Sequence, residues 1–220
     1  MLENPFTPES KKAKKSLFAT DKKARFLNIN KETLKLVKEV GEEFELGDYG
    51  GIEIKKYQLP FLHDLENLFI KYSKNQGQLY TREQARKFIA ERLASDYQEY
   101  SGKAVHNGEI LGLDLSADYD PFSGTNFDRF GQLPQSISIL RHLEFLALNH
   151  GTLSELPTSI ANLPNLIELQ IANCKNLAVA NLLPLIKRCK KLKRIILPIT
   201  DDHEILIQAW QKELPNLEVI

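Results

Sequence analysis

Leucine and isoleucine recur at regular intervals along the second half of the chain. The pattern L-x-x-L-x-L starts at Ile110, Leu143, Leu166 and Leu192, with a shortened copy from Leu217. These starts lie 33, 23, 26 and 25 residues apart. Apolar residues that alternate with variable ones over so few positions predict a short β-strand in each copy. Because one such strand has nothing to bury its apolar side against, the repetition predicts a stack of similar coils.

The segments that lead into two of these strands also repeat each other. LPQSISILRHLEFLAL begins at residue 133, and LPTSIANLPNLIELQI begins at residue 156. Their shared block L-P-x-x-I-x-x-L predicts a turn and a short helical or 3₁₀ return, with Ile and Leu facing the interior. Cys189 occupies the place that Leu140 and Leu163 hold in these two copies. We therefore expect Cys189 to be a small buried apolar residue.

Composition changes near the middle of the chain. Residues 1–109 contain 17 Leu plus Ile, whereas residues 110–220 contain 35. Ser101-Gly102 follows a helical pattern and is typical of a helix end, and Asn107-Gly108 between apolar residues predicts a type I′ hairpin. We expect a repeat domain over 103–220, with this hairpin as the cap of its first strand.

These repeats resemble the leucine-rich repeat family, in its Leu-Pro-x-x-Ile class. The resemblance implies an α/β fold, a short solenoid of about five parallel strands. It also implies a protein partner, such as a small GTPase or another signalling protein, because the class occurs in intracellular scaffolds of Ras-type signalling. The family has an Asn/Cys position after each strand, and of the four residues there only Cys174 fits. The other three are Asp118, Gly151 and Thr200.

The variable positions of the strands are expected to form one continuous concave face. Apolar residues collect in the last coils, at Ile196, Pro198, Ile199 and Val219, and an exposed apolar patch there would suit a protein partner. The alternative is that the N-terminal half or a second copy of the chain covers this face. The predicted partner-binding residues are Phe145, Ala147, Asn149, His150, Glu168, Gln170, Asn173, Arg194, Ile196 and Ile199.

The first half predicts helices. Apolar residues at helical spacing indicate one helix over 33–45 and a second over 61–74. Thr81 with Gln84 forms a capping box that would start a third helix, running to about Tyr100. We expect these helices to form a small, mainly α domain over 29–102.

LFIKYSKNQGQLYTREQARKFI, which begins at residue 68, resembles an EF-hand. The resemblance makes Ser73, Asn75 and Glu83 candidate calcium ligands, but the loop is one residue short and lacks the usual Asp residues. A fainter second unit would surround Gly50 and Ile52. We expect a metal-free helical module, and a calcium-responsive regulatory protein is the alternative.

Charge and cysteine content limit the kinds of partner and the cellular location that the sequence favours. The 29 basic and 29 acidic residues cancel, so no overall field attracts nucleic acid or membrane. Basic residues cluster over 10–25, within an expected flexible arm at 1–28, and over Lys187–Arg194. An anionic-surface or nucleic-acid binder is therefore a further alternative, although solvated surface charge explains such clusters more simply. Two cysteines and no apolar run long enough for a membrane helix favour the cytoplasm.

No convergent catalytic set is evident. Ser116, Asp114 and His150 would lie near one another on the sheet, but Asp114 is on the serine's own side rather than behind the imidazole. No phosphate-binding glycine loop or Cys/His metal spacing occurs. The sequence therefore predicts a cytoplasmic, non-catalytic scaffold without a cofactor, which binds a protein partner on the concave face.

Overall fold

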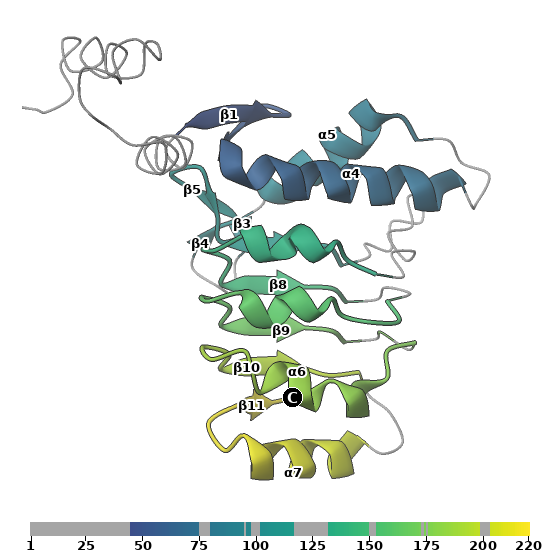
Figure 1. Ribbon diagram of the computed structural model, residues 1–220, viewed down its shortest axis with the longest axis vertical. Helices are drawn as coiled ribbons and strands as arrows, with labels where there is room; N and C mark the ends of the chain where they lie inside the picture. Colours follow the sequence, from purple (N-terminus) through teal and green to yellow (C-terminus); the bar gives the residue numbers. More distant parts are fainter. Residues whose placement is uncertain are drawn as a thin grey trace, which may run out of the picture. The chain divides into compact units, whose positions relative to one another are not determined.

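The computed structural model describes residues 45–74, 80–94, 96–97, 102–116, 132–149, 153–172, 174, 176–198 and 203–220 (Figure 1). Apart from Glu45, these residues belong to one compact unit, Leu46–Ile220. The fold of this unit is mixed α/β. The arm expected at 1–28 lies outside the described residues, and so does the helix expected at 33–45, apart from Glu45. Within the described ranges, no helix is both long enough and apolar enough to cross a membrane.

A five-stranded parallel sheet occupies the second half, in the order β11-β10-β9-β8-β7. Leu113, Leu146, Leu169 and Ile195 lie side by side on adjacent strands, and all four are fully buried. The predicted set of about five parallel strands is therefore confirmed. The strands are β7 (Gly112–Asp114), β8 (Phe145–Ala147), β9 (Glu168–Gln170), β10 (Arg194–Ile196) and β11 (Glu218–Val219).

Short helical segments return the chain from one strand to the next, on one side of the sheet (Figure 1). In the first two returns, Ile137 and Ile160 are fully buried, as the repeated block predicts. Cys189 is also buried, which confirms its predicted place among the apolar residues. The segments are η4 (Gln135–Ile139), η5 (Thr158–Asn162), η6 (Val179–Asn181), α6 (Leu183–Ile186) and α7 (His203–Glu213).

The last strand corrects the predicted register by one residue. The sequence pattern places Ile220 in the core beside Ile195, but Val219 pairs with Ile195 instead. Val219 is 6% exposed and Ile220 is 46% exposed. Leu217 and Val219 are two residues apart, whereas the matching residues of earlier coils are three apart. Because side chains alternate along a strand, this shift of one residue turns Val219 toward the core and Ile220 toward solvent.

The first part of the unit contains two helices and small antiparallel hairpins. The helix predicted over 61–74 is confirmed as α4. The capping box is also confirmed, since Thr81 N donates to Gln84 Oε1 at 2.8 Å and Gln84 N donates to Thr81 Oγ1 at 3.2 Å. The elements are β1 (Leu46–Tyr49), β2 (Ile52–Lys55), η2 (Lys56–Gln58), α4 (Leu59–Lys74), α5 (Arg82–Ala94), β3 (Asp96–Tyr97), β4 (Gly102–Lys103), β5 (Val105–His106) and β6 (Glu109–Ile110).

The third helix is shorter than predicted. α5 ends at Ala94 rather than near Tyr100, because Tyr97 pairs with Gly102 in the β3–β4 ladder. The apolar spacing that predicted a longer helix includes Tyr97, which lies in β3 instead. Sequence spacing alone does not distinguish these two uses over a single turn.

No calcium-binding loop forms at the fainter second EF-hand-like unit. β1 and β2 pair antiparallel across this segment, with Tyr49 opposite Ile52. Gly50 and Gly51 make the turn with φ of 63° and 91°, and Gly51 N donates to Asp48 Oδ2 at 3.1 Å. The faint resemblance to a second hand therefore does not describe this segment, because the turn glycines close a hairpin.

The predicted type I′ hairpin joins β5 to β6, with positive φ at both central residues, Asn107 (51°) and Gly108 (77°). The buried Gln58 side chain holds it in place. Its Nε2 donates to Gly108 O at 2.7 Å, and its Oε1 accepts from Ile110 N at 3.0 Å. This contact ties the helical part to the edge of the parallel sheet.

One apolar core runs through both parts of the unit. Ile89 of α5, Ile110 of β6 and Leu113 of β7 belong to the same buried cluster. The boundary near residue 103 stays a prediction about how the chain is organised, but the core is not divided there.

Candidate functional site on the parallel sheet

A row of hydrogen-bonded side chains crosses the sheet from strand to strand. Asn149 is at its centre, with Nδ2 donating to Gln170 Oε1 at 2.9 Å and Oδ1 accepting from Ala172 N at 2.9 Å. On one side, Asn149 N donates to Ser116 Oγ at 3.1 Å. On the other, Gln170 Nε2 donates to Glu168 Oε1 at 2.6 Å. The row fixes side chains on neighbouring strands relative to one another.

Arg194 extends this row to the last strand. Its Nε donates to Glu218 Oε2 at 2.9 Å, and its Nη1 lies 3.4 Å from Glu168 Oε2. The bond to Glu218 and the charge of Glu168 raise the pKa of Arg194 above its ordinary value. The Glu168 side chain is fully buried, whereas that of Arg194 is 39% exposed. Arg194 therefore compensates a buried carboxylate and still presents part of its guanidinium group at the surface.

The apolar residues of the predicted site are less exposed than expected. Phe145 and Ala147 are buried, and Ile196 is half-buried. Pro198 and Val219 are also buried, which corrects the expected exposed patch at the last coils. Among the described members, Asn149, Arg194 and Ile196 keep appreciable surface. His150, Asn173 and Ile199 lie outside the described residues.

Cys174 occupies the one Asn/Cys position that fits the family pattern. It is fully buried, and its Sγ lies 3.0 Å from Leu148 O of the preceding coil, to which the thiol donates. The thiol thus links two successive strand-and-return units. Asn149, one residue beyond the strand pattern of its own coil, links three, and sequence reasoning assigned it only to the binding face. Its position directly after Leu148 was the available signal.

Ser116 and Asp114 both take part in hydrogen bonds within the sheet. Ser116 N donates to Asp114 Oδ1 at 2.8 Å, and Ser116 Oγ accepts from Asn149 N. The first contact forms a turn at the end of β7, and the second joins Ser116 to the segment that follows β8. His150, the third residue of the arrangement considered from the sequence, is outside the described residues.

The basic cluster Lys187–Arg194 is partly neutralised. Lys187 Nζ lies 2.7 Å from Glu213 Oε2, an exposed pair that lowers the pKa of Glu213. Lys191 Nζ donates to Asn165 Oδ1 at 2.7 Å, and Arg194 is held by its two carboxylates. The ion pairs of Lys187 and Arg194 reduce the charge that is available to an anionic surface, whereas the bond of Lys191 to a neutral amide does not.

The described structure only partly contains the candidate calcium ligands. Asn75 lies outside it, as does the side chain of Ser73, and Glu83 is an exposed residue of α5. Within the described ranges, no three His, Cys, Asp or Glu residues are grouped closely enough to hold a metal ion.

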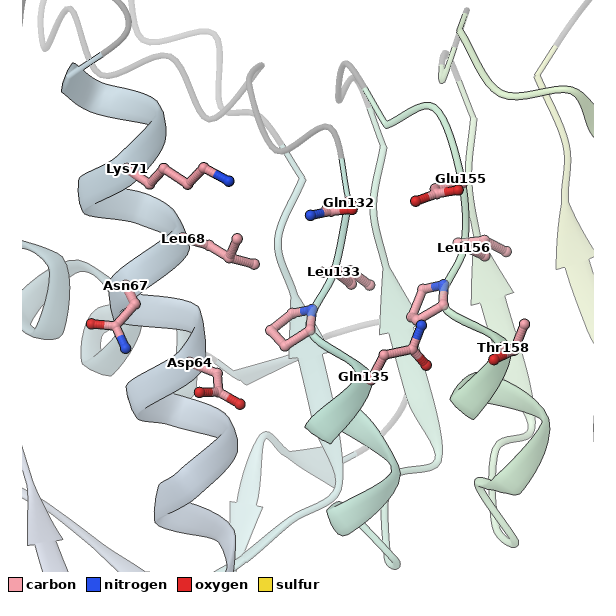
Figure 2. Close-up of a pocket in the computed structure, with 12 residues that line it drawn as sticks. Asp64, Asn67, Leu68, Lys71, Gln132, Leu133, Gln135, Glu155, Leu156 and Thr158 are labelled. Atoms are coloured by element: carbon pink, nitrogen blue, oxygen red, sulfur yellow. The ribbon is translucent and has the colours of Figure 1, made fainter.

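A pocket of about 470 Å³ lies on another face, between α4 and the first two return segments (Figure 2). Sequence reasoning missed it, because α4 and these segments are far apart in the chain. Ser136 Oγ donates to Asp64 Oδ2 at 2.5 Å across 72 residues. The available signal was the spacing of polar and apolar residues on α4, at Asp64, Asn67, Leu68 and Lys71, which is that of one helix face.

Comparisons with known proteins find similarity to plant proteins. The chain is 32% identical over 138 residues to the disease resistance protein RPP8 and to the probable disease resistance RPP8-like protein 4, both of Arabidopsis thaliana. The aligned segment covers 61% of this chain and 14% of each relative, so the chain spans about one seventh of their length. No protein-family model matches the chain.

Proposed function

We propose that this chain is a leucine-rich-repeat protein whose coils form a short solenoid. It binds a protein partner on the open face of the sheet, which is the face that carries Asn149, Gln170 and Arg194. The parallel strands and their similar returns support this reading. Similarity to disease resistance proteins supports a role in protein interaction or signalling. We further propose that the protein acts in the cytoplasm, without catalysis and without a cofactor.

The observation that carries the proposal is the fixed position of Arg194 beside Ile196 on β10. Arginine is enriched at the centres of protein interfaces, where it combines apolar contact with hydrogen bonds. Two carboxylates already hold Arg194, so little side-chain freedom is left to lose when a partner binds. Ile196 lies two residues further along the strand and therefore on the same face.

The test is affinity capture with the tagged full chain, followed by mass spectrometry. Ile196→Asp places a charge on the proposed face without removing a member of the hydrogen-bonded row. We expect this variant to lose the proteins that the wild-type chain captures. Ile205→Asp is the matched control, because Ile205 is a 68% exposed isoleucine of α7 and not of the sheet.

Both variants should keep the wild-type circular dichroism spectrum and melting temperature. Unchanged capture by Ile196→Asp, or equal loss in both variants, would contradict this face as the binding site. Arg194→Glu is unsuitable for the test, since it would bring a third carboxylate to Glu168 and Glu218 and weaken the fold itself.

A further inference from the structure

The pocket between α4 and the first two return segments, called the α4 groove below, has a defined internal order. Leu68 of α4, Leu133 and Leu156 lie in one row across it (Figure 2). Leu68 belongs to α4, whereas Leu133 and Leu156 lie in the loops just before η4 and η5, so the row runs across three segments of the chain. The volume of the α4 groove, about 470 Å³, is in the range of pockets that bind small ligands.

Polar side chains border this apolar row on both sides. Lys71, Gln132 and Glu155 lie on one side in Figure 2, and Asp64, Gln135 and Thr158 lie on the other. Lys71 and Glu155 are exposed and, in the part of the chain that the structure describes, form no ion pair with each other or with a third residue. A cation on α4 and an anion in the loop before η5 are thus available along one border.

The backbone of the groove also offers hydrogen-bonding groups. Leu133 and Leu156 each precede a proline with extended dihedral angles, Pro134 (φ −65°, ψ 142°) and Pro157 (φ −63°, ψ 137°). Neither leucine belongs to a strand, and among the described residues neither backbone N–H has a hydrogen-bond partner. Extended, unpaired backbone is what an extended peptide can pair with.

The lining residues disfavour other ligand classes. None of the twelve is aromatic, so the groove offers no ring on which a sugar or a nucleobase could stack. Lys71 is the one cation among them, against Asp64 and Glu155, which disfavours a ligand with several phosphates. Aliphatic side chains with amide groups on both sides match a peptide, whose backbone donates and accepts.

We propose that the α4 groove binds a short extended peptide with aliphatic side chains flanked by one acidic and one basic residue. The aliphatic side chains contact Leu68, which is half-buried, and the small exposed parts of Leu133 (5%) and Leu156 (7%). The acidic residue pairs with Lys71, and the basic residue pairs with Glu155. This site is independent of the proposed partner site on the sheet.

Fluorescence anisotropy of three labelled, end-blocked tetrapeptides with the full chain tests the proposal. All three have two central leucines, and their outer residues are one Asp and one Lys, two Asp, or two Lys. We expect saturable binding, tightest for the mixed peptide. Lys71→Gln should weaken the Asp peptide about threefold and leave the Lys peptide unchanged, and Glu155→Gln should do the reverse.

His63→Gln, at an exposed position of α4 outside the groove, is the matched control and should leave all three affinities unchanged. Leu68→Ala should weaken all three peptides about tenfold, with its melting temperature measured alongside. Absence of saturable binding would overturn the proposal. It would also be overturned if Lys71→Gln and Glu155→Gln had equal effects on the peptide with two Asp and on the peptide with two Lys. Displacement of a bound peptide by glucose or inorganic phosphate would also overturn it. Ile196→Asp should bind the peptides normally, which separates this test from that of the sheet face.

Discussion

The parallel sheet and the helical part of the unit build one core by different means. In the sheet, Leu146 lies between Leu113 and Leu169, so each strand buries the same residue type against its neighbours. In the helical part, single contacts differ from one another. Phe69 packs edge-on against Tyr80 at a ring separation of 5.1 Å, and Arg86 lies 2.9 Å from the fully buried Glu66. A repeated contact leaves a repeated sequence pattern, whereas a contact made once leaves none.

The largest expected effect tests whether the two parts unfold together. Leu169→Ala in the sheet and Ile89→Ala in α5 each remove a fully buried aliphatic group. Each should lower the free energy of unfolding by about 3 kcal/mol, through lost burial and the cavity that remains. Because both residues belong to one core, urea unfolding followed by helical circular dichroism and by fluorescence of the single Trp210 should give coincident curves.

Ile205→Ala is the control, and its effect should be within about 0.5 kcal/mol, since Ile205 is exposed. Two separate transitions in either core variant would show that the parts fold independently. That result would favour the predicted boundary near residue 103 over the continuous core.

The sequence predicted the sheet well because its evidence was repeated. Leu113, Leu146, Leu169 and Ile195 occupy one position in four copies, so an error at one copy would be visible against the other three. The last coil has no following copy, and there the prediction failed by one residue, at Val219. The hairpin at Asn107-Gly108 and the cap at Thr81 were also predictable, because local geometry determines both.

The candidate sites were harder to predict. Alternation identified Glu168 and Phe145 as residues of the open face, but it does not report how far their neighbours bury them. The α4 groove depends on contacts between elements distant in sequence, such as Asp64 with Ser136. Neither burial nor distant contact follows from spacing along the chain.

The next effect compares the two buried carboxylates. Arg194→Ala in the sheet and Arg86→Ala in α5 each remove an arginine that compensates a fully buried glutamate, Glu168 or Glu66. Glu66 keeps a second arginine, Arg82, at 3.8 Å. Each substitution should lower the free energy of unfolding, because a buried carboxylate loses an opposite charge. The loss should be smaller than for a wholly buried pair, because each arginine side chain is roughly 40% exposed.

Adding the matching Glu168→Gln or Glu66→Gln substitution removes the uncompensated charge and should restore part of the loss, which a double-mutant cycle measures. If the double variants are no more stable than the arginine variants, the carboxylates are not the cause of the cost.

A smaller difference is expected between two glycines with positive φ. An alanine Cβ at Gly108 would lie 2.5 Å from Leu46 Cδ2, whereas at Gly51 it would have no atom within 4 Å. Gly51→Ala should therefore cost about 1 kcal/mol from backbone strain alone, and Gly108→Ala about 2 kcal/mol because of the added clash. Thermal unfolding of both variants measures the difference. Equal costs would indicate that the hairpin cap shifts freely against β1.

The smallest effect concerns Cys189, whose equivalent residues in two other repeats are Leu140 and Leu163. Burial raises the pKa of Cys189 to about 11 from an ordinary value of 9.0. Between these pH values the unfolded thiol loses its proton while the folded one keeps it, so the stability that this group contributes falls as pH rises. The wild-type chain should lose about 1 kcal/mol more than Cys189→Ala between pH 8 and pH 10, as measured by urea unfolding.

The comparison uses the change with pH in each protein, so the cavity that alanine leaves does not enter it. Parallel pH profiles would mean that the thiol ionises as readily in the folded chain as in the unfolded one, and thus that water reaches this coil. A steeper wild-type profile would place Cys189 in the same dry interior as Leu140 and Leu163, which is what the repeated sequence requires of that position.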